Sequence, residues 1–387
     1  MNEEIYEDIE PENNENLEIK IPFDPNLIKI STKPMTLGQI IDMIQNNKVN
    51  LFTEYQRLPD LWNDVKKSKL IESILLRLPL PNFYFDADDE NHWSVVDGLQ
   101  RISTLKSFVI DQTLTLQKME FLTEYNGMKY NHLPRPLQRR ILTFPIIAYI
   151  IDKGTPDVVK YNIFSRINQG GLLLTPQEIR QALHQGTPAD LIADLVRGED
   201  KIAINGSVLK KATAEGRAFV KAVGRISTER MQDRDFATRF ASFYLIDYRK
   251  YKPDMDSFLN RGMGRIKFLT SEEIQRLKDD FRAAMELAWD VFGSAAFRKK
   301  FPEGEKRGGI NKALFETFSV TFGKLSHDER MKINSQKDQL QKMLDNALAI
   351  RDSAFFQSIT SGTALTRMVI VRFFVINQMV KQVLTHA

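Results

Sequence analysis

Apolar and polar positions follow two different periods along this chain, and the change in period divides the chain in two. Between about residues 21 and 185, short apolar runs such as 83–85, 93–96 and 144–151 are interleaved with stretches of helical spacing. Short runs rich in aromatic and β-branched side chains indicate strands, and apolar positions three or four apart indicate helices. We therefore predict an α+β domain with a small sheet over residues 21–185.

From residue 186 to residue 387 the apolar spacing is almost wholly helical, which predicts a mainly α-helical domain. The predicted helices of this domain are 189–196, 215–225, 233–248, 271–292, 311–325, 335–351 and 364–385. The most apolar stretch, residues 368–376, is short for a membrane span and is interrupted by Arg372. We expect a buried helix there and no membrane partner.

Helix starts are well marked in the α+β domain. Thr36 and Asn63 stand where N-caps belong, and Thr175 with Glu178 three residues later forms a capping box that has proline at the first helical position. The acidic run 86–91 separates two predicted strands, and its composition predicts an exposed, solvated turn. A cation-binding loop is the weaker alternative, because the spacing of the carboxylates matches no EF-hand.

The charge distribution adds a possible partner to this outline. The chain of 387 residues has a formal charge of +4, but residues 1–18 contain eight acidic residues and no Lys or Arg, so the remainder carries +12. We expect residues 1–20 to be an acidic disordered tail. A basic body with an acidic tail is compatible with nucleic-acid binding, the tail competing for the basic surface; a merely solubilising tail is the simpler alternative.

Cysteine is absent, which excludes a disulfide framework, a thiolate metal site and a thiol nucleophile. The N-terminus is acidic rather than basic and apolar, so it does not resemble a secretory signal. We expect a cytoplasmic protein. The five histidines are His92, His132, His184, His327 and His386. They are widely scattered, and we therefore expect no nuclease centre and no metal-ligating residues in this chain.

The stretch from His92 to Phe108 carries the most specific chemistry. Its apolar run 93–96 predicts a strand, the pair Asp97-Gly98 breaks it, and helical spacing begins at Leu99. Asp97 stands where an N-cap belongs, and Gly98 permits a sharp bend or a close approach of the backbone to a ligand. This is a strand, a two-residue turn and a helix.

Such a turn is suited to binding an anion. Unpaired N–H groups and a partial positive charge at a helix N-terminus favour phosphate, and Gln100 and Arg101 lie in the first turn, where Arg101 presents a planar fork to phosphate oxygens. The alternative is that Asp97 simply caps the helix and Arg101 forms a surface ion pair. The residues of this stretch leave both interpretations open.

Residues 95–101, Val-Val-Asp-Gly-Leu-Gln-Arg, resemble the DGQQR signature of the GmrSD-type restriction endonuclease N-terminal domain family, which has a ParB/sulfiredoxin-like fold. Further resemblances occur in the same order: Tyr55, Gln56 and Arg57 with Trp62, the run 70–75 (Leu-Ile-Glu-Ser-Ile-Leu), and the element that contains Arg166, Asn168, Gly170 and Gly171. Leu99 departs from the pattern, because it replaces the first glutamine. It either loses a ligand contact or packs in the core.

The resemblance implies a ParB/sulfiredoxin-like N-terminal domain followed by a mainly α-helical C-terminal domain, α+β overall. It implies a nucleotide-binding module, expected to hydrolyse NTP, of a bacterial phage-defence or modification-dependent restriction system. Asp97 and Arg101 are the implied catalytic residues. The implied nucleotide-binding residues are Tyr55, Gln56, Arg57, Gly98, Gln100, Arg166, Asn168, Gly170 and Gly171. In this interpretation Asp97 orients a water or a divalent ion, and the arginines neutralise phosphoryl charge.

The implied cofactor is a nucleoside triphosphate, and a requirement for magnesium stays open. DNA is the expected partner; a nuclease subunit and a homodimer stay open. The alternative function is a non-catalytic DNA-binding specificity or regulatory subunit that uses the same anion pocket. A ParB-like clamp that closes on DNA is a third hypothesis. In longer family members a stretch similar to residues 230–240 recurs, so Arg230, Asp233 and Arg239 are weak site candidates, with surface or interdomain ion pairs as the simpler interpretation.

Overall fold

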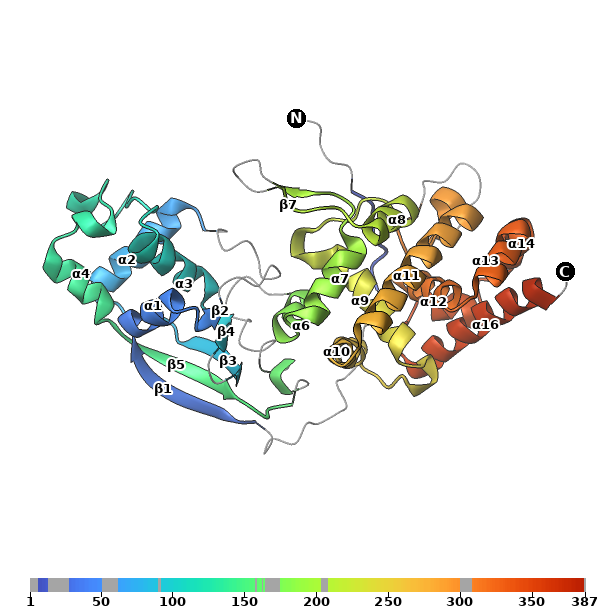
Figure 1. The fold of residues 1–387 in the computed structure, drawn as a ribbon, viewed down its shortest axis with the longest axis horizontal. Helices are drawn as coiled ribbons and strands as arrows, with labels where there is room; N and C mark the ends of the chain where they lie inside the picture. Colours follow the sequence, from blue (N-terminus) through green and yellow to red (C-terminus); the bar gives the residue numbers. More distant parts are fainter. Residues whose placement is uncertain are drawn as a thin grey trace. The chain divides into compact units, whose positions relative to one another are not determined.

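The computed structural model describes residues 6–12, 28–50, 62–89, 92–156, 159–161, 163, 175–202, 208–299 and 308–385. The chain divides into two compact units (Figure 1). The α/β unit is Pro22–Leu183, and the helical unit is Met1–Ile21 together with His184–Ala387. The architecture is α+β, with the sheet near the N-terminus and helices in the C-terminal half, as the hydrophobic pattern predicts.

The described residues of the α/β unit form a five-stranded sheet in the order β1-β5-β3-β4-β2. Its strands are β1 (Ile30–Thr36), β2 (Val49–Asn50), β3 (Phe83–Asp89), β4 (His92–Asp97) and β5 (Pro145–Asp152). Strand β5 pairs antiparallel with β1 and parallel with β3, and β4 pairs antiparallel with β3 and parallel with β2. The three strands predicted from apolar runs are therefore confirmed as β3, β4 and β5.

Helices cover the sheet on both faces. The helices of this unit are α1 (Leu37–Gln45), α2 (Asp64–Leu75), α3 (Leu99–Leu105), α4 (Arg135–Leu142) and α6 (Pro176–Leu183), with the short helices η2 (Lys106–Ile110), η3 (Thr123–Tyr125) and η4 (Tyr130–His132). Phe83 and Phe85 of β3 pack with the apolar side chains of α1, α2 and α3. Val96 of β4 packs on the opposite face against Ile179 and Leu183 of α6.

The predicted helix starts are confirmed. The side chains of Thr36 and Asn63 accept hydrogen bonds from the backbone N–H groups of Gln39 and Lys66, which begins α1 and α2. The Thr175 hydroxyl accepts from the Glu178 N–H at 3.2 Å, and the Glu178 carboxylate accepts from the Thr175 N–H at 2.6 Å. These local hydrogen bonds satisfy N–H groups that have no partner inside a helix.

The prediction of an exposed acidic turn at residues 86–91 is wrong for its first part. Strand β3 continues to Asp89, so Asp86 lies within the sheet and is buried. Its carboxylate oxygens accept hydrogen bonds of 2.8 and 2.9 Å from Nζ of Lys160, a side chain that is only 1% exposed. A buried carboxylate requires a charged partner, and here the partner lies 74 residues further along the chain.

The helical unit is built around the long helix α11 (Ser271–Phe292), which packs against α8 and α12. Its other described helices are α7 (Thr187–Val196), α8 (Ala214–Val223), α9 (Gln232–Leu245), α10 (Met255–Ile266), α12 (Lys312–Gly323), α13 (His327–Ser335), α14 (Lys337–Ala349), α15 (Ala354–Ser358) and α16 (Thr366–Thr385), with short helices η6 (Glu229–Met231), η7 (Tyr248–Lys250) and η8 (Gly293–Ala295). Strands β6 (Lys201–Ile202) and β7 (Val208–Lys210) form a small antiparallel pair.

Aromatic side chains fill the centre of the helical unit. Phe236 of α9 and Phe315 of α12 meet edge to face with ring centroids 4.9 Å apart, and Phe240 meets Phe281 of α11 in the same way at 4.8 Å. Such pairs contribute beyond their buried area. Helix α10 was not predicted from the sequence, because its two glycines weaken the helical pattern.

By length and composition alone, α16 could cross a membrane, and it is the one such helix among the described residues. In this structure it packs as a core helix. Its Arg372 is 1% exposed and forms an ion pair with Glu316 of α12, and the guanidinium also donates to the carbonyl oxygen of Thr363 at 2.7 Å. The interruption that Arg372 makes in the apolar run is thus an internal anchor of the helical unit.

The prediction of a free acidic tail is wrong for residues 6–12. Ile9 forms a parallel bridge with Ile310, and carboxylates of this segment pair with basic side chains of the helical unit. The remaining residues of the predicted tail, 1–5 and 13–20, lie outside the described residues. Pattern analysis failed here because the partners of these carboxylates are more than 200 residues away in the sequence.

Candidate functional site: the turn between β4 and α3

Strand β4 ends at Asp97, and α3 begins at Leu99, with Gly98 as its N-cap. The expectation that Asp97 is the N-cap is therefore wrong. Gly98 has φ 103° and ψ 6°, and a Cβ at this position would lie 2.6 Å from Cδ1 of Phe83. Only glycine satisfies both conditions, because other residues are strained at this φ and their side chain would overlap the aromatic ring.

Arg101 fixes this turn from inside the protein. The residue is 8% exposed, and its guanidinium carbon lies 4.3 Å from the centre of the Phe83 ring. The guanidinium donates to Oδ2 of Asp97 at 2.8 Å, to the carbonyl oxygen of Asn82 at 3.2 Å and to that of Pro81. Burial lowers the pKa of Arg101 below its ordinary value, and the neighbouring Asp97 partly offsets this. Arg101 therefore ties the start of β3 to the end of β4.

Asp97, unlike Arg101, is partly exposed to solvent. Its side chain is 36% exposed, so the carboxylate accepts the hydrogen bond from Arg101 while part of it faces outward. The pairing of β3 with β4 shifts register here: Tyr84 lies opposite Asp97, whereas the next residue, Phe85, lies opposite Val95. A bulge of this kind redirects a side chain, and bulges are common beside functional sites.

Two stacked tyrosines lie beside Asp97 on the sheet. Tyr84 of β3 and Tyr149 of β5 are paired in register, and their rings stack with centroids 5.0 Å apart. Burial raises the pKa of the Tyr84 phenol, and Tyr149 and the Asp97 carboxylate raise it further. Neither tyrosine was predicted from the sequence as a site residue. The available signal was a phenol in the middle of each apolar run, where a strand alternates its two faces.

The other predicted site residues divide into two groups. Gln100 lies half-buried in the first turn of α3, directly before Arg101 and three residues after Asp97, and Leu99 packs against the core of the α/β unit. The packing alternative for Leu99 therefore holds. Tyr55, Gln56, Arg57, Arg166, Asn168, Gly170 and Gly171 lie outside the described residues. Their convergence on the turn stays a prediction.

The run 70–75 contributes Glu72, whose role is structural. The carboxylate is 4% exposed and accepts hydrogen bonds from the backbone N–H groups of Glu120, Phe121 and Leu122 at 3.1, 2.7 and 2.9 Å. Burial acts to raise the pKa of Glu72, but these three N–H groups outweigh it and hold the pKa below its ordinary value. Glu72 thus fastens the loop after η2 to helix α2.

In the part of the chain that the structure describes, no group of three or more His, Asp or Glu side chains is placed to hold a metal ion. The donor set at the turn nevertheless fits magnesium bound together with a nucleotide. Mg²⁺ keeps several waters and is usually bound by one or two carboxylates plus substrate phosphates, and the outward part of Asp97 supplies one such carboxylate.

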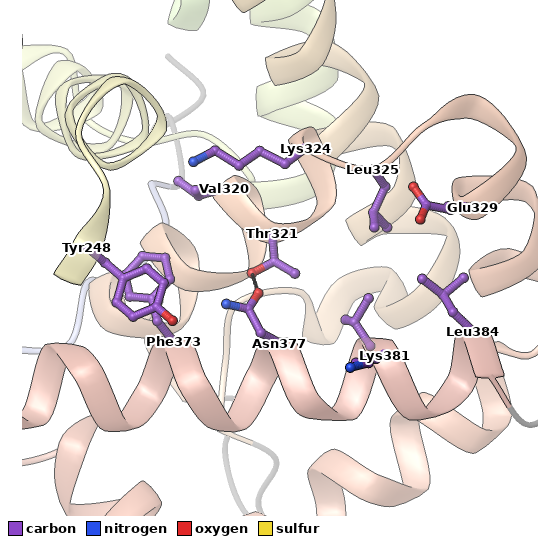
Figure 2. Close-up of a pocket in the computed structure, with 11 residues that line it drawn as sticks. Tyr248, Val320, Thr321, Lys324, Leu325, Glu329, Phe373, Asn377, Lys381 and Leu384 are labelled. Atoms are coloured by element: carbon purple, nitrogen blue, oxygen red, sulfur yellow. Dashed lines mark hydrogen bonds between the residues drawn. The ribbon is translucent and has the colours of Figure 1, made fainter.

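The helical unit contains a separate cavity of about 310 Å³ between α12, α13 and α16 (Figure 2). Tyr248 stacks on Phe373 at one end, with centroids 4.7 Å apart, and the Thr321 hydroxyl donates to Oδ1 of Asn377 at 2.9 Å. Burial lowers the pKa of Lys324 on the cavity wall. Apolar and polar side chains both line the cavity, the polar ones including Lys324, Glu329 and Lys381, and none of the predicted site residues is among them.

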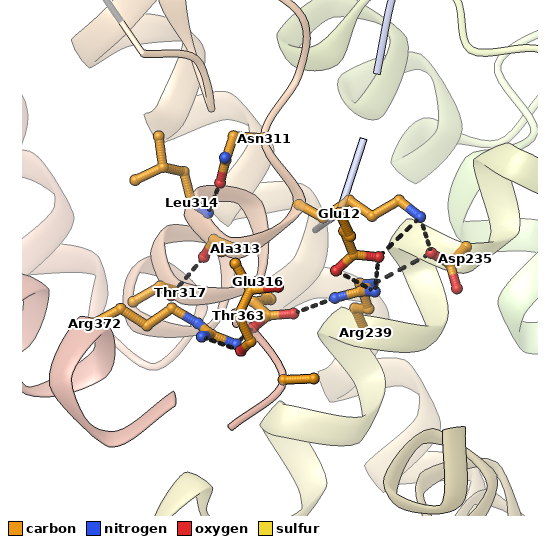
Figure 3. A network of polar contacts seen from close by, with 12 residues as sticks. Glu12, Asp235, Arg239, Asn311, Ala313, Leu314, Glu316, Thr317, Thr363 and Arg372 are labelled. Atoms are coloured by element: carbon orange, nitrogen blue, oxygen red, sulfur yellow. Dashed lines mark hydrogen bonds and ion pairs between the residues drawn. The ribbon is translucent and has the colours of Figure 1, made fainter. Parts of the chain in front are cut away.

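The weak candidates at residues 230–240 are not a surface cluster. Asp233 and Arg239 are buried in α9, and Arg239 pairs with carboxylates from three different segments (Figure 3). Arg230 has φ 59° just before α9. The surface ion-pair interpretation is therefore wrong for Arg239, which belongs to an internal network.

Comparison with known proteins gives one match. Residues 37–185 match the family model described as GmrSD restriction endonuclease, N-terminal domain. No match was found to a curated protein or to a solved structure. The matched segment contains the Asp97–Arg101 turn, the helix that carries Glu72, and strands β3, β4 and β5. Residues 37–185 of this chain are therefore a GmrSD restriction endonuclease N-terminal domain.

Proposed function

We propose that this chain is a component of a bacterial phage-defence restriction system whose α/β unit binds and hydrolyses a nucleoside triphosphate at the β4–α3 turn. The family assignment supports the restriction context. The observation that carries the nucleotide site is the Asp97 carboxylate, which is held at the end of a strand by a buried arginine and remains 36% exposed. In the same proposal the α/β unit is ParB/sulfiredoxin-like.

The residues of the turn have distinct roles in this proposal. Asp97 orients the attacking water. If magnesium were bound, Asp97 would be one of its ligands and the ion would supply charge neutralisation on the phosphates. The water oxygen forms a bond to the γ-phosphorus, the bond from that phosphorus to the β–γ bridging oxygen breaks, and the proton of the water passes to solvent. The products are the nucleoside diphosphate and inorganic phosphate.

Arg101 acts in this scheme as a positioning residue rather than as a direct phosphate ligand. Its guanidinium is engaged with Asp97 and with the carbonyl oxygens of Pro81 and Asn82. It therefore holds Asp97 in one orientation, which is what a preorganised site requires. Charge neutralisation on the phosphates falls to Arg57 and Arg166, and Tyr84 is an added candidate for contact with the ligand.

The test is nucleotide turnover by the purified full chain with Asp97→Asn, using Asp111→Asn as the matched control. Asp111 pairs with Lys106 in the same region, outside the proposed site. We expect Asp97→Asn to reduce turnover about 100-fold or more while Asp111→Asn has wild-type rates. Full turnover by Asp97→Asn would exclude this site as a catalytic centre.

A second function, a non-catalytic DNA-binding specificity or regulatory subunit, is favoured by one specific observation. Arg101 is occupied by internal acceptors, and Leu99 packs in the core, so two positions of the motif serve the fold. Calorimetric binding of a nucleotide without product release would select this function. In both proposals DNA and a separate nuclease subunit are partners, and the protein acts in the cytoplasm. A homodimeric clamp on DNA would be revealed by a change in oligomeric mass when the ligand is added.

A further inference from the structure

Residues 6–12, which we call the acidic strap, are attached to the helical unit through their backbone. The Glu7 N–H donates to the carbonyl oxygen of Arg225 at 2.8 Å, the Ile310 N–H donates to that of Asp8 at 2.7 Å, and the Glu10 N–H donates to that of Ile310 at 3.0 Å. The strap therefore pairs with the backbone at residue 310 in the way that an added β-strand pairs with a sheet edge. The two backbones lie close together, because a Cβ on Gly309 would be 3.0 Å from backbone atoms of Asp8 and Glu10.

Each glutamate of the strap meets a basic side chain. Glu7 pairs with Arg298 at 2.9 Å, and Glu10 pairs with Lys299 at 2.7 Å and accepts from the amide of Asn311 at 2.9 Å. Glu12 accepts two hydrogen bonds from Arg239, at 2.7 and 2.9 Å, and lies 3.5 Å from Lys312 (Figure 3). We call the surface formed by Arg239, Arg298, Lys299 and Lys312 the basic groove.

The strap balances the charge of this groove. Apart from the strap, the ion pairs seen among the described residues join Arg239, Arg298, Lys299, Lys312 and Arg372 with Asp235 and Glu316, and the formal charges of these seven residues sum to +3. Glu7, Glu10 and Glu12 supply three negative charges. With the strap in place the side chains of Arg298 and Arg239 are only 3% and 5% exposed, so the strap shields these cations from water and its glutamates are among their anionic partners.

The groove also has room for oxygen-rich groups. A cavity of about 220 Å³ lies beside Glu10 and Glu12. Its other polar walls are formed by Lys299, Asn311, Lys312, Thr360 and Thr363. Ammonium, amide and hydroxyl groups are the donors that contact phosphate oxygens in nucleic-acid complexes.

We propose that the basic groove binds the phosphodiester backbone of a nucleic acid and that the acidic strap occupies the groove in its place, as an internal competitor. Nucleic acid is favoured over an acidic peptide because the basic excess extends beyond the groove: residues 19–387 carry a formal +12. A polyanion of high charge density gains from that whole field, whereas a short peptide gains only from local pairs.

The inference adds a location to the DNA binding of the proposed function, and it does not depend on the nucleotide site. Its test measures nucleic-acid affinity without any nucleotide present. Failure of the groove would leave turnover at Asp97 untouched, and failure of turnover would leave the groove untouched.

The experiment compares the full chain with Glu10→Gln and with the triple variant Glu7→Gln, Glu10→Gln, Glu12→Gln. The probes are labelled single-stranded and duplex DNA of about 20 nucleotides, titrated at several salt concentrations. The matched control is Asp8→Asn, because the Asp8 carboxylate forms no ion pair among the described residues and the change in charge equals that of Glu10→Gln.

We expect the triple variant to bind DNA about tenfold more tightly or better, with a plot of log affinity against log salt that is steeper by about 2 to 3. Glu10→Gln should show a smaller gain and Asp8→Asn none. Adding Lys299→Glu to the triple variant should cancel most of the gain. A preference for one of the two probes would identify the form of nucleic acid that is bound.

Three results would overturn the proposal. The triple variant could bind DNA as the wild-type chain does, Asp8→Asn could give the same gain as Glu10→Gln, or poly-glutamate could bind the triple variant more tightly than DNA at equal salt. If the triple variant proves unfolded by circular dichroism, Glu10→Gln decides the question, since it removes one charge and keeps the amide within reach of Asn311.

Discussion

Two buried arginines, one in each unit, are held in opposite ways. Arg101 takes its partners from nearby in the chain: Asp97 lies four residues before it, and the carbonyl groups of Asn82 and Pro81 lie 19 and 20 residues before it. Arg239 binds Glu316, 77 residues later, and Glu12, 227 residues earlier. One network shapes a turn, and the other joins three distant segments.

The difference shows what each network is able to do. The partners of Arg101 lie at the end of β4 and just before β3, two strands that pair in one sheet, so its ion pair holds Asp97 in one orientation. The strap carboxylates belong to a segment that carries little of the core, and Arg239 would keep Glu316 and Asp235 if Glu12 left. Segments with few buried apolar contacts open at low cost, so the distant network is the one that allows exchange of an anion.

The largest expected effect is at Glu316, which is fully buried between Arg239 and Arg372. Glu316→Gln should destabilise the protein by about 3–5 kcal/mol, because it leaves two buried cations without their shared carboxylate. Urea unfolding measures the change, and Glu286→Gln, an exposed position on α11, is the control. Equal unfolding midpoints for the two variants would show that the distant network does not hold the helical unit together.

A smaller effect is expected at Arg101. Arg101→Lys keeps the charge but cannot reach Asp97 and both carbonyl groups together, and it should cost about 2–3 kcal/mol. Asp97→Asn should cost less, because Asp97 is partly exposed. Thermal unfolding compares the two variants, and the control is Lys106→Gln, which removes a partly exposed pair with Asp111. A larger loss of stability for Asp97→Asn than for Arg101→Lys would contradict the role of Arg101 in holding Asp97 and the start of β3 together.

The smallest effect is expected at Glu72. This residue tests the comparison of near and distant partners, because it is a carboxylate of the α/β unit whose hydrogen-bond donors lie 48 to 50 residues away in the sequence. Glu72→Gln should cost about 1–2 kcal/mol at neutral pH. The folded-state pKa of Glu72 lies below its ordinary value, so its stabilisation is present above that ordinary value and is lost as the pH falls through the folded pKa.

The difference in the free energy of unfolding between wild type and Glu72→Gln, measured with denaturant, should therefore shrink on acidification to about pH 3. The control is Glu124→Gln, because Glu124 is an exposed carboxylate in η3 of the same region. If this free-energy difference stays constant between neutral and acidic pH, the charge of Glu72 is not what holds the loop on α2.

The predictions from the sequence were accurate where the interacting residues are close together in the chain. The caps at Thr36, Asn63 and Thr175 were predictable because each interacts with a backbone N–H three residues later. The strands β3, β4 and β5 were predictable because each contains a short apolar run rich in aromatic and β-branched side chains. The α+β division and the helical second half followed from periodicity, since one spacing repeats over many residues.

The errors have the opposite origin. Asp86 is acidic and lies in an acidic run, so composition placed it in solvent, yet Lys160 draws it into the sheet. Asp97 has the residue type of an N-cap, but contact with Phe83 and the positive φ give that place to Gly98. The strap glutamates read as a soluble tail because their partners lie at the other end of the chain.

By itself, the sequence determined most of the helices, the strands β3, β4 and β5, the two-part organisation and the position of the β4–α3 turn, because helix capping, strand patterning and glycine geometry depend on neighbours in the chain. Only the tertiary structure decided that Arg101 faces inward, that Tyr84 and Tyr149 flank Asp97, and that residues 6–12 occupy a basic groove. The physical reason is desolvation: a charge becomes buried only where folding brings an opposite charge to it, and that meeting leaves no trace in local sequence.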